Sequence, residues 1–207
     1  MKTTENYLAE IKEIRKMMED SSRFLSLSGL SGVLIGIYAL IGAAVYYIKM
    51  NTSQAIEYYS NSDGIISFML LTAISVLVVS FITVVLLTYK RARKAGKKIW
   101  NPGSRLMLLN LAIPLISGGL LILIFIFKGV YEIVAPGCLL FYGLALVNAA
   151  KFTRQEIFYM GLFQILLGIL AALLPSFGLI IWALGFGVLH IIYGVVMYFR
   201  YEHKSNE

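Results

Sequence analysis

Apolar residues along the chain gather into six long runs, separated by short polar connections. Each run has roughly 18 to 25 residues, the length that an α-helix needs to cross a hydrocarbon layer about 30 Å thick. Helices are expected because backbone amides in lipid must be satisfied within their own segment. The predicted spans are residues 24–48, 65–89, 106–127, 130–150, 157–174 and 177–199. The pattern therefore predicts an all-α polytopic membrane protein with six transmembrane helices in a bundle.

A different pattern precedes the first run. One apolar stripe in it consists of Tyr7, Ile11, Ile14 and Met18. Spacings of four, three and four residues place them on one face of an amphipathic helix. Residues 1–23 hold five basic and five acidic side chains, so this helix is unlike the basic helices that seek lipid surfaces. We expect residues 5–20 to pack on the protein's own loops or to lie flat at the membrane; self-association or a protein partner is the alternative.

Lysine and arginine are distributed unevenly among the connections. Sixteen of the eighteen lie at the two termini and in alternate connections, whereas Lys49 and Lys128 lie in the others. Because cytoplasmic segments carry the excess of basic residues, both termini are expected in the cytoplasm. The expected parts are a cytoplasmic amphipathic helix (1–23), a six-helix transmembrane domain (24–199) and a cytoplasmic tail (200–207).

Composition agrees with a membrane protein and excludes several other classes. The 207 residues are 59% apolar and 14% charged, whereas soluble domains are about half apolar and a quarter charged. One cysteine, Cys138, cannot form a disulfide within the chain, which excludes a disulfide-stabilised secreted scaffold. The net charge of +7 arises in loops beside the spans, where anionic headgroups lie. Membrane lipid is therefore the expected partner, and nucleic acid is not.

The first span carries small residues at four-residue spacing. Ser28, Gly32 and Gly36 form a ridge that lets a neighbouring helix backbone approach closely. The ridge is expected to pack against another helix of the same chain; contact with a second copy is the alternative.

Four polar side chains lie at depth within the predicted spans. They are Asn110, Tyr142, Gln164 and His190. Because polar groups are costly against lipid, we expect them to point inward and toward one another as a candidate intramembrane polar cluster. For His190, a hydrogen-bonded interior role, a proton- or solute-handling role and a haem or metal ligand all remain open. The only other histidine is His203, in the polar tail.

Motifs that carry catalysis are missing from the sequence. Acidic residues are absent from the predicted span centres, although ion-driven transporters and intramembrane proteases usually need them. No phosphate-binding glycine loop or zinc-protease helix occurs. We therefore expect a protein that is not an enzyme and has no catalytic, metal or cofactor residues.

Three stretches of the sequence resemble a family of small, uncharacterised bacterial membrane proteins. These are residues 21–32 (SSRFLSLSGLSG), 141–149 (FYGLALVNA) and 182–190 (WALGFGVLH). The family has six spans and no established activity, so the resemblance implies an inner-membrane location and no site residue. The expected function is non-catalytic, through protein or lipid contacts. The alternative is a small-solute or ion pathway in an oligomer, lined by the four polar side chains.

Overall fold

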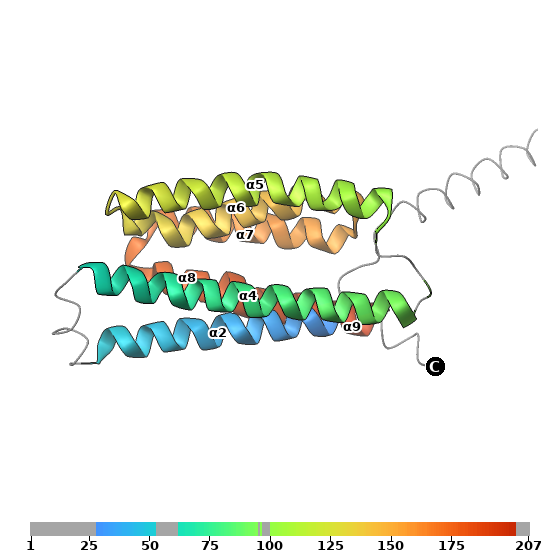
Figure 1. Cartoon of the computed structure of the whole chain (residues 1–207), viewed down its shortest axis with the longest axis horizontal. Coiled ribbons are helices and arrows are strands. Elements are labelled where there is room, and N and C mark those ends of the chain that lie inside the picture. Colours follow the sequence, from blue (N-terminus) through green and yellow to red (C-terminus); the bar gives the residue numbers. More distant parts are fainter. Residues whose placement is uncertain (1–27, 53–61, 95, 97–99, 202–207) are drawn as a thin grey trace, which may run out of the picture.

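The computed structural model describes residues 28–52, 62–94, 96 and 100–201, and the regular elements within them are all helical (Figure 1). The first four long helices are α2 (Gly29–Asn51), α4 (Ser62–Lys94), α5 (Pro102–Phe127) and α6 (Val134–Ala149), and α6 lies between the short turns η1 (Tyr131–Ile133) and η2 (Ala150–Phe152). Helix α7 (Gln155–Leu173) follows. The last segment, here named span six, joins η3 (Pro175–Phe177), α8 (Gly178–Ala183), the π-helical η4 (Leu184–Leu189) and α9 (His190–Tyr201).

Six helical segments of this part of the chain are long and apolar enough to cross a membrane. The all-α class and the number of candidate spans agree with the sequence prediction, and both are compatible with a multi-pass membrane protein. The amphipathic helix predicted for residues 5–20 and most of the tail 200–207 lie outside the described residues.

Two helices extend beyond their apolar runs. Helix α4 continues to Lys94 rather than ending at residue 89, because lysine, arginine and alanine are good helix formers. Helix α5 begins at Pro102 rather than at residue 106, because Asn101 and Ser104 form a capping box. The Asn101 side chain accepts from Ser104 N at 2.8 Å and the Ser104 hydroxyl accepts from Asn101 N at 2.9 Å. Reciprocal caps of this kind satisfy amides that the helix leaves open.

The connection between α5 and η1 reverses the chain within a few residues. Gly129 has a φ of 77°, a left-handed conformation that glycine adopts without a steric penalty. The amides of Gly129 and Val130 donate to Ile126 O (3.0 Å) and Phe125 O (2.9 Å), so the last carbonyls of α5 are capped. The two helices are thereby held as a tight hairpin.

The long helices form two groups that span six connects. Helix α6 packs against both α5 and α7, and α2 packs against both α4 and α9. In span six, α8 contacts α6 and α7, whereas η4 and α9 lie along α2. Figure 1 shows α5, α6 and α7 on one side and α2 and α4 on the other. The contacts of α4 are mainly with α2, and most of its apolar side chains are exposed.

Glycine pairs set the closest approaches between helices. Gly143 of α6 faces Gly161 of α7: a Cβ atom on Gly143 would lie 2.7 Å from the Gly161 carbonyl oxygen. Gly32 of α2 faces Gly194 of α9 in a similar way, with 2.9 Å to its Cα atom. Close backbone packing of this kind is a main source of association between helices in lipid.

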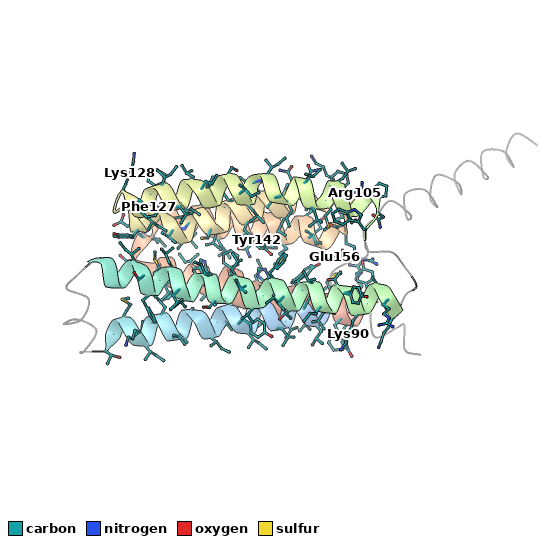
Figure 2. All side chains as sticks on the ribbon, in the orientation of Figure 1. Lys90, Arg105, Phe127, Lys128, Tyr142 and Glu156 are labelled. Atoms are coloured by element: carbon teal, nitrogen blue, oxygen red, sulfur yellow. The ribbon has the colours of Figure 1, made fainter. Side chains whose placement is uncertain are left out.

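The two ends of the packed helices differ in charge. Figure 2 shows Lys90, Arg105 and Glu156 at one end, here named the basic end, and Phe127 and Lys128 at the other. The lysines and arginines of the described chain at the basic end are Lys90, Arg91, Arg93, Lys94, Arg105, Lys151, Arg154 and Arg200. The opposite end has Lys49 and Lys128.

Candidate functional site

Three of the four polar residues selected from the sequence meet where α6, α7 and span six converge. The Tyr142 hydroxyl lies 2.9 Å from His190 Nε2, and His190 Nδ1 lies 3.0 Å from the Gly185 carbonyl oxygen. Gln164 Nε2 donates to the same carbonyl at 2.9 Å. Tyr142, Gln164, His190 and Gly185 are here named the central polar cluster. Figure 2 labels Tyr142 about midway along the helices, between the two groups.

The partners of His190 determine which ring nitrogen carries the proton. A carbonyl oxygen only accepts, so Nδ1 must be the protonated nitrogen that donates to Gly185. In the neutral ring Nε2 is then an acceptor, and the Tyr142 hydroxyl donates to it. His190 is 3% exposed, and burial of a charged imidazolium is costly. The arrangement fits a neutral histidine that is fully hydrogen-bonded.

The Gly185 carbonyl, which accepts from both Gln164 and His190, belongs to the first turn of the π-helical segment η4. A π-helix widens the helical turn locally and is found mostly as a short insertion. Gly185 is buried, and a Cβ atom there would lie 2.7 Å from Gln164 Oε1. Glycine at this position therefore lets the Gln164 amide reach the backbone of span six.

Aromatic rings surround the imidazole of His190. Trp182, Phe186 and His190 follow at four-residue spacing on span six, with ring centroids 4.9 Å apart for the first pair and 5.8 Å for the second. The Tyr142 ring lies 5.1 Å from Phe186 and 5.5 Å from His190. Centroid separations of this size are typical of stabilising aromatic pairs. The cluster is therefore packed by rings as well as by hydrogen bonds.

Two buried polar atoms near the cluster lack a partner in the described chain. They are Gln164 Oε1 and the hydroxyl of Tyr193. Gln164 is fully buried, and Tyr193 packs with Met160, Ile157 and Met197 in an apolar core. Buried polar atoms usually have a hydrogen-bond partner. Gln164 Oε1 could therefore accept one more hydrogen bond, and the nearby Tyr193 hydroxyl could donate one.

The remaining residues selected from the sequence lie elsewhere. Asn110 donates to Leu106 O on its own helix at 2.8 Å and shares no hydrogen bond with the other three selected polar residues. Gly32 and Gly36 face α9 and η4 within the same chain, so span six covers the ridge of α2. Ser28 is buried just before α2, and its carbonyl accepts from the hydroxyl and the amide of Ser31.

A second polar group lies at the basic end and was missed by the sequence reasoning. Tyr201 donates to Glu156 Oε1 at 2.7 Å, and Arg200 pairs with the same oxygen at 2.9 Å. The Arg154 guanidinium lies over the Tyr201 ring, 3.6 Å from its centroid. The available signal was an acidic residue at the start of one span opposite an arginine near the end of the next, antiparallel span.

Comparisons with known proteins add no assignment. No protein-family model matches the sequence, and no curated protein or solved structure matches it. Among the residues whose positions are described, no group of three or more His, Cys, Asp or Glu side chains could hold a metal ion.

Proposed function

We propose that this chain is a non-catalytic integral protein of the bacterial inner membrane that acts through contacts with proteins or lipid. One observation carries the proposal: Tyr142 and Gln164 both direct their donors to span six, at 2.9 Å each. Polar groups used in this way join helices, as is common in membrane proteins. The resemblance to small six-span bacterial membrane proteins supports the same location.

Two surfaces are the proposed contact regions. The ridge of Gly32 and Gly36 is covered by span six, which supports packing within the chain rather than self-association there. The proposed protein contact is therefore residues 5–20, outside the described part, whereas the exposed apolar side chains of α4 suit contact with lipid. Deleting residues 1–20 tests the first region: we expect the oligomer mass or a cross-linked partner to be lost. Unchanged mass and cross-links would contradict it.

Orientation follows from the charge of the two ends. We propose that the basic end and both termini face the cytoplasm, because eight described lysines and arginines lie at that end and two at the other.

A pathway for a small solute or ion is the second candidate. Gln164 Oε1 and the Tyr193 hydroxyl favour it, because both are buried without a partner in the described chain and a passing water or ion would supply one. The pathway would use Tyr142, Gln164 and His190; Asn110 would join it only through a change of its present hydrogen bond.

Flux through proteoliposomes separates the two candidates. Purified protein is reconstituted with a pH-sensitive dye inside, and proton and potassium leak is compared with protein-free liposomes. The proposed function predicts equal leak. Leak above the protein-free level that falls in both Gln164→Met and His190→Ala, but not in Glu132→Gln at the opposite end, would favour the pathway instead. Absence of a Soret band in the purified protein is expected as well, and its presence would restore the haem reading of His190.

A further inference from the structure

One flat face of the Arg154 guanidinium group is covered by an aromatic ring, whereas its N–H groups have no acceptor in the described chain. The group lies 3.6 Å from the centroid of the Tyr201 ring, so the ring covers one face through a cation–π contact. The five N–H donors of arginine lie in the guanidinium plane, parallel to such a ring. Within the part of the chain that is described, the Arg154 side chain makes no ion pair or hydrogen bond. Its planar fork is therefore available to an anion.

The ring beneath Arg154 is held in place by other groups. The Tyr201 hydroxyl donates to Glu156 Oε1 at 2.7 Å, and the same oxygen receives Arg200 at 2.9 Å. The salt bridge of Glu156 is thus made with Arg200. Glu156 forms this ion pair with Arg200 and not with Arg154, so the positive charge of Arg154 is not neutralised by an ion pair within the described chain.

The position of Arg154 along the chain places it at the expected depth of lipid headgroups. It lies in the short connection between η2 and α7, directly before a span that begins at Gln155. Lys151, three residues earlier in the same connection, is exposed, whereas Arg154 is half-buried. Glu156 is the one carboxylate at the basic end whose side chain is described, against eight basic residues. The local potential is therefore positive.

We propose that Arg154, together with Lys151, binds the phosphate group of an anionic phospholipid headgroup. Arginine binds phosphate through two parallel N–H···O bonds, which a lysine cannot reproduce. The Tyr201 ring orients the fork, and the lysine adds a second charge at the surface. This inference rests on the proposed function, since it names the lipid class and the residues of a lipid contact.

Lipid retention by the full-length protein tests the inference. Protein in mild detergent is titrated with phosphatidylglycerol or with zwitterionic phosphatidylcholine, and bound lipid is counted by native mass spectrometry. Wild-type protein is expected to prefer phosphatidylglycerol. Arg154→Gln is expected to weaken that binding on the order of tenfold, the loss typical of a charge-assisted hydrogen-bonded pair. Arg154→Lys keeps the charge but loses the fork, and we expect an intermediate loss.

Arg93→Gln is the matched control. It removes the same charge from an exposed arginine at the same end, in the last turn of α4, and is expected to change binding less than twofold, as for a surface charge. The site would be overturned if Arg93→Gln and Arg154→Gln weakened phosphatidylglycerol binding equally. It would also be overturned if Arg154→Lys bound phosphatidylglycerol as tightly as the wild-type protein. Arg154→Lys also keeps the test decisive if Arg154→Gln does not fold, which circular dichroism would report.

Inorganic phosphate distinguishes the source of the anion. If millimolar phosphate without lipid raises the melting temperature as much as phosphatidylglycerol does, and Arg154→Gln abolishes both shifts, the site binds free phosphate and the headgroup assignment is wrong. Failure of the lipid site is also separable from failure of the proposed function. Unaltered lipid binding by Arg154→Gln would contradict this inference alone. The proposed function would instead be contradicted by a proteoliposome leak above the protein-free level that falls in Gln164→Met and His190→Ala.

Discussion

Gly32 of α2 and Gly194 of α9 are in backbone contact, so that a Cβ atom on Gly32 would lie 2.9 Å from the Gly194 Cα atom and 3.3 Å from the His190 carbonyl oxygen. Both neighbours are backbone, which cannot move aside without shifting a helix. The contact joins the group containing α2 and α4 to span six, and through span six to α6 and α7.

Substitution of Gly32 by alanine is therefore expected to destabilise the protein. Overpacking of a close contact costs about 1–3 kcal/mol, and thermal unfolding in detergent would show it as a lower melting temperature. Gly119→Ala in α5 is the control, because a Cβ atom there would meet nothing within 4 Å. That change should leave the melting temperature equal or slightly higher, since alanine favours helix over glycine. Equal losses for both variants would show that the close approach at Gly32 is not what stabilises the pair.

Tyr142→Phe removes one hydroxyl and leaves His190 Nε2 without its donor. The bond of 2.9 Å joins α6 to span six, and hydrogen bonds between helices in lipid contribute about 1 kcal/mol, with a further cost for an unpaired buried acceptor. We expect a loss of about 1–2 kcal/mol in the free energy of unfolding. Tyr131→Phe is the matched control, because Tyr131 is 40% exposed. A neutral Tyr142→Phe would mean that the hydroxyl does not hold the helices together.

Gln164→Met is expected to be much milder than Tyr142→Phe. The Gly185 carbonyl would still accept from His190 Nδ1, and the substitution would remove the unpartnered Oε1 atom of Gln164 together with its donor. Replacing a polar group that is only half satisfied by an apolar one of similar length is close to neutral. Chemical denaturation of both variants gives the comparison. A loss for Gln164→Met larger than for Tyr142→Phe would contradict this account and imply that Oε1 has a partner in the working protein.

Glu156→Gln tests the polar group at the basic end. The amide oxygen can still accept from Tyr201, but the ion pair with Arg200 is lost. Because the Arg200 side chain is 64% exposed, solvent screens the pair, and we expect a loss below about 1 kcal/mol. The difference from wild type should shrink in 1 M salt, where exposed charges are screened. Glu132→Gln, exposed at the opposite end, should show no change at either salt concentration.

Much of the fold could be read from the sequence because its strongest signal is the length of each apolar run. The position of polar residues within the apolar runs selected Tyr142, Gln164 and His190 for a common cluster, and the structure brings these three together. Asn110 was selected with them, but its amide donates to its own helix at Leu106. Depth along a helix does not give the direction in which a side chain points.

Other parts of both polar groups could not be predicted, because they depend on contacts between helices. The carbonyl of Gly185 receives two side chains, and no residue type marks a backbone acceptor in a sequence. Glu156 and Tyr201 are 45 positions apart and meet only once α7 and span six have folded back on each other. Glycine spacing marked Gly32 as part of an interface, yet its partner Gly194 could be identified only from the structure.

Labelling of introduced cysteines decides the orientation proposed for the basic end. In a Cys138→Ser background, Lys94→Cys at the end of α4 and Lys128→Cys after α5 place single thiols at exposed sites of opposite ends. Helices α4 and α5 each run the full length of the packed helices (Figure 1), so the two sites should lie on opposite faces of the membrane. Because cytoplasmic segments hold the excess of lysine and arginine, a membrane-impermeant maleimide added to intact cells should label Lys128→Cys and not Lys94→Cys. The reverse pattern would mean that the basic end faces outward, contrary to the proposed orientation. Labelling of both cysteines from outside would contradict the membrane-spanning assignment of α5.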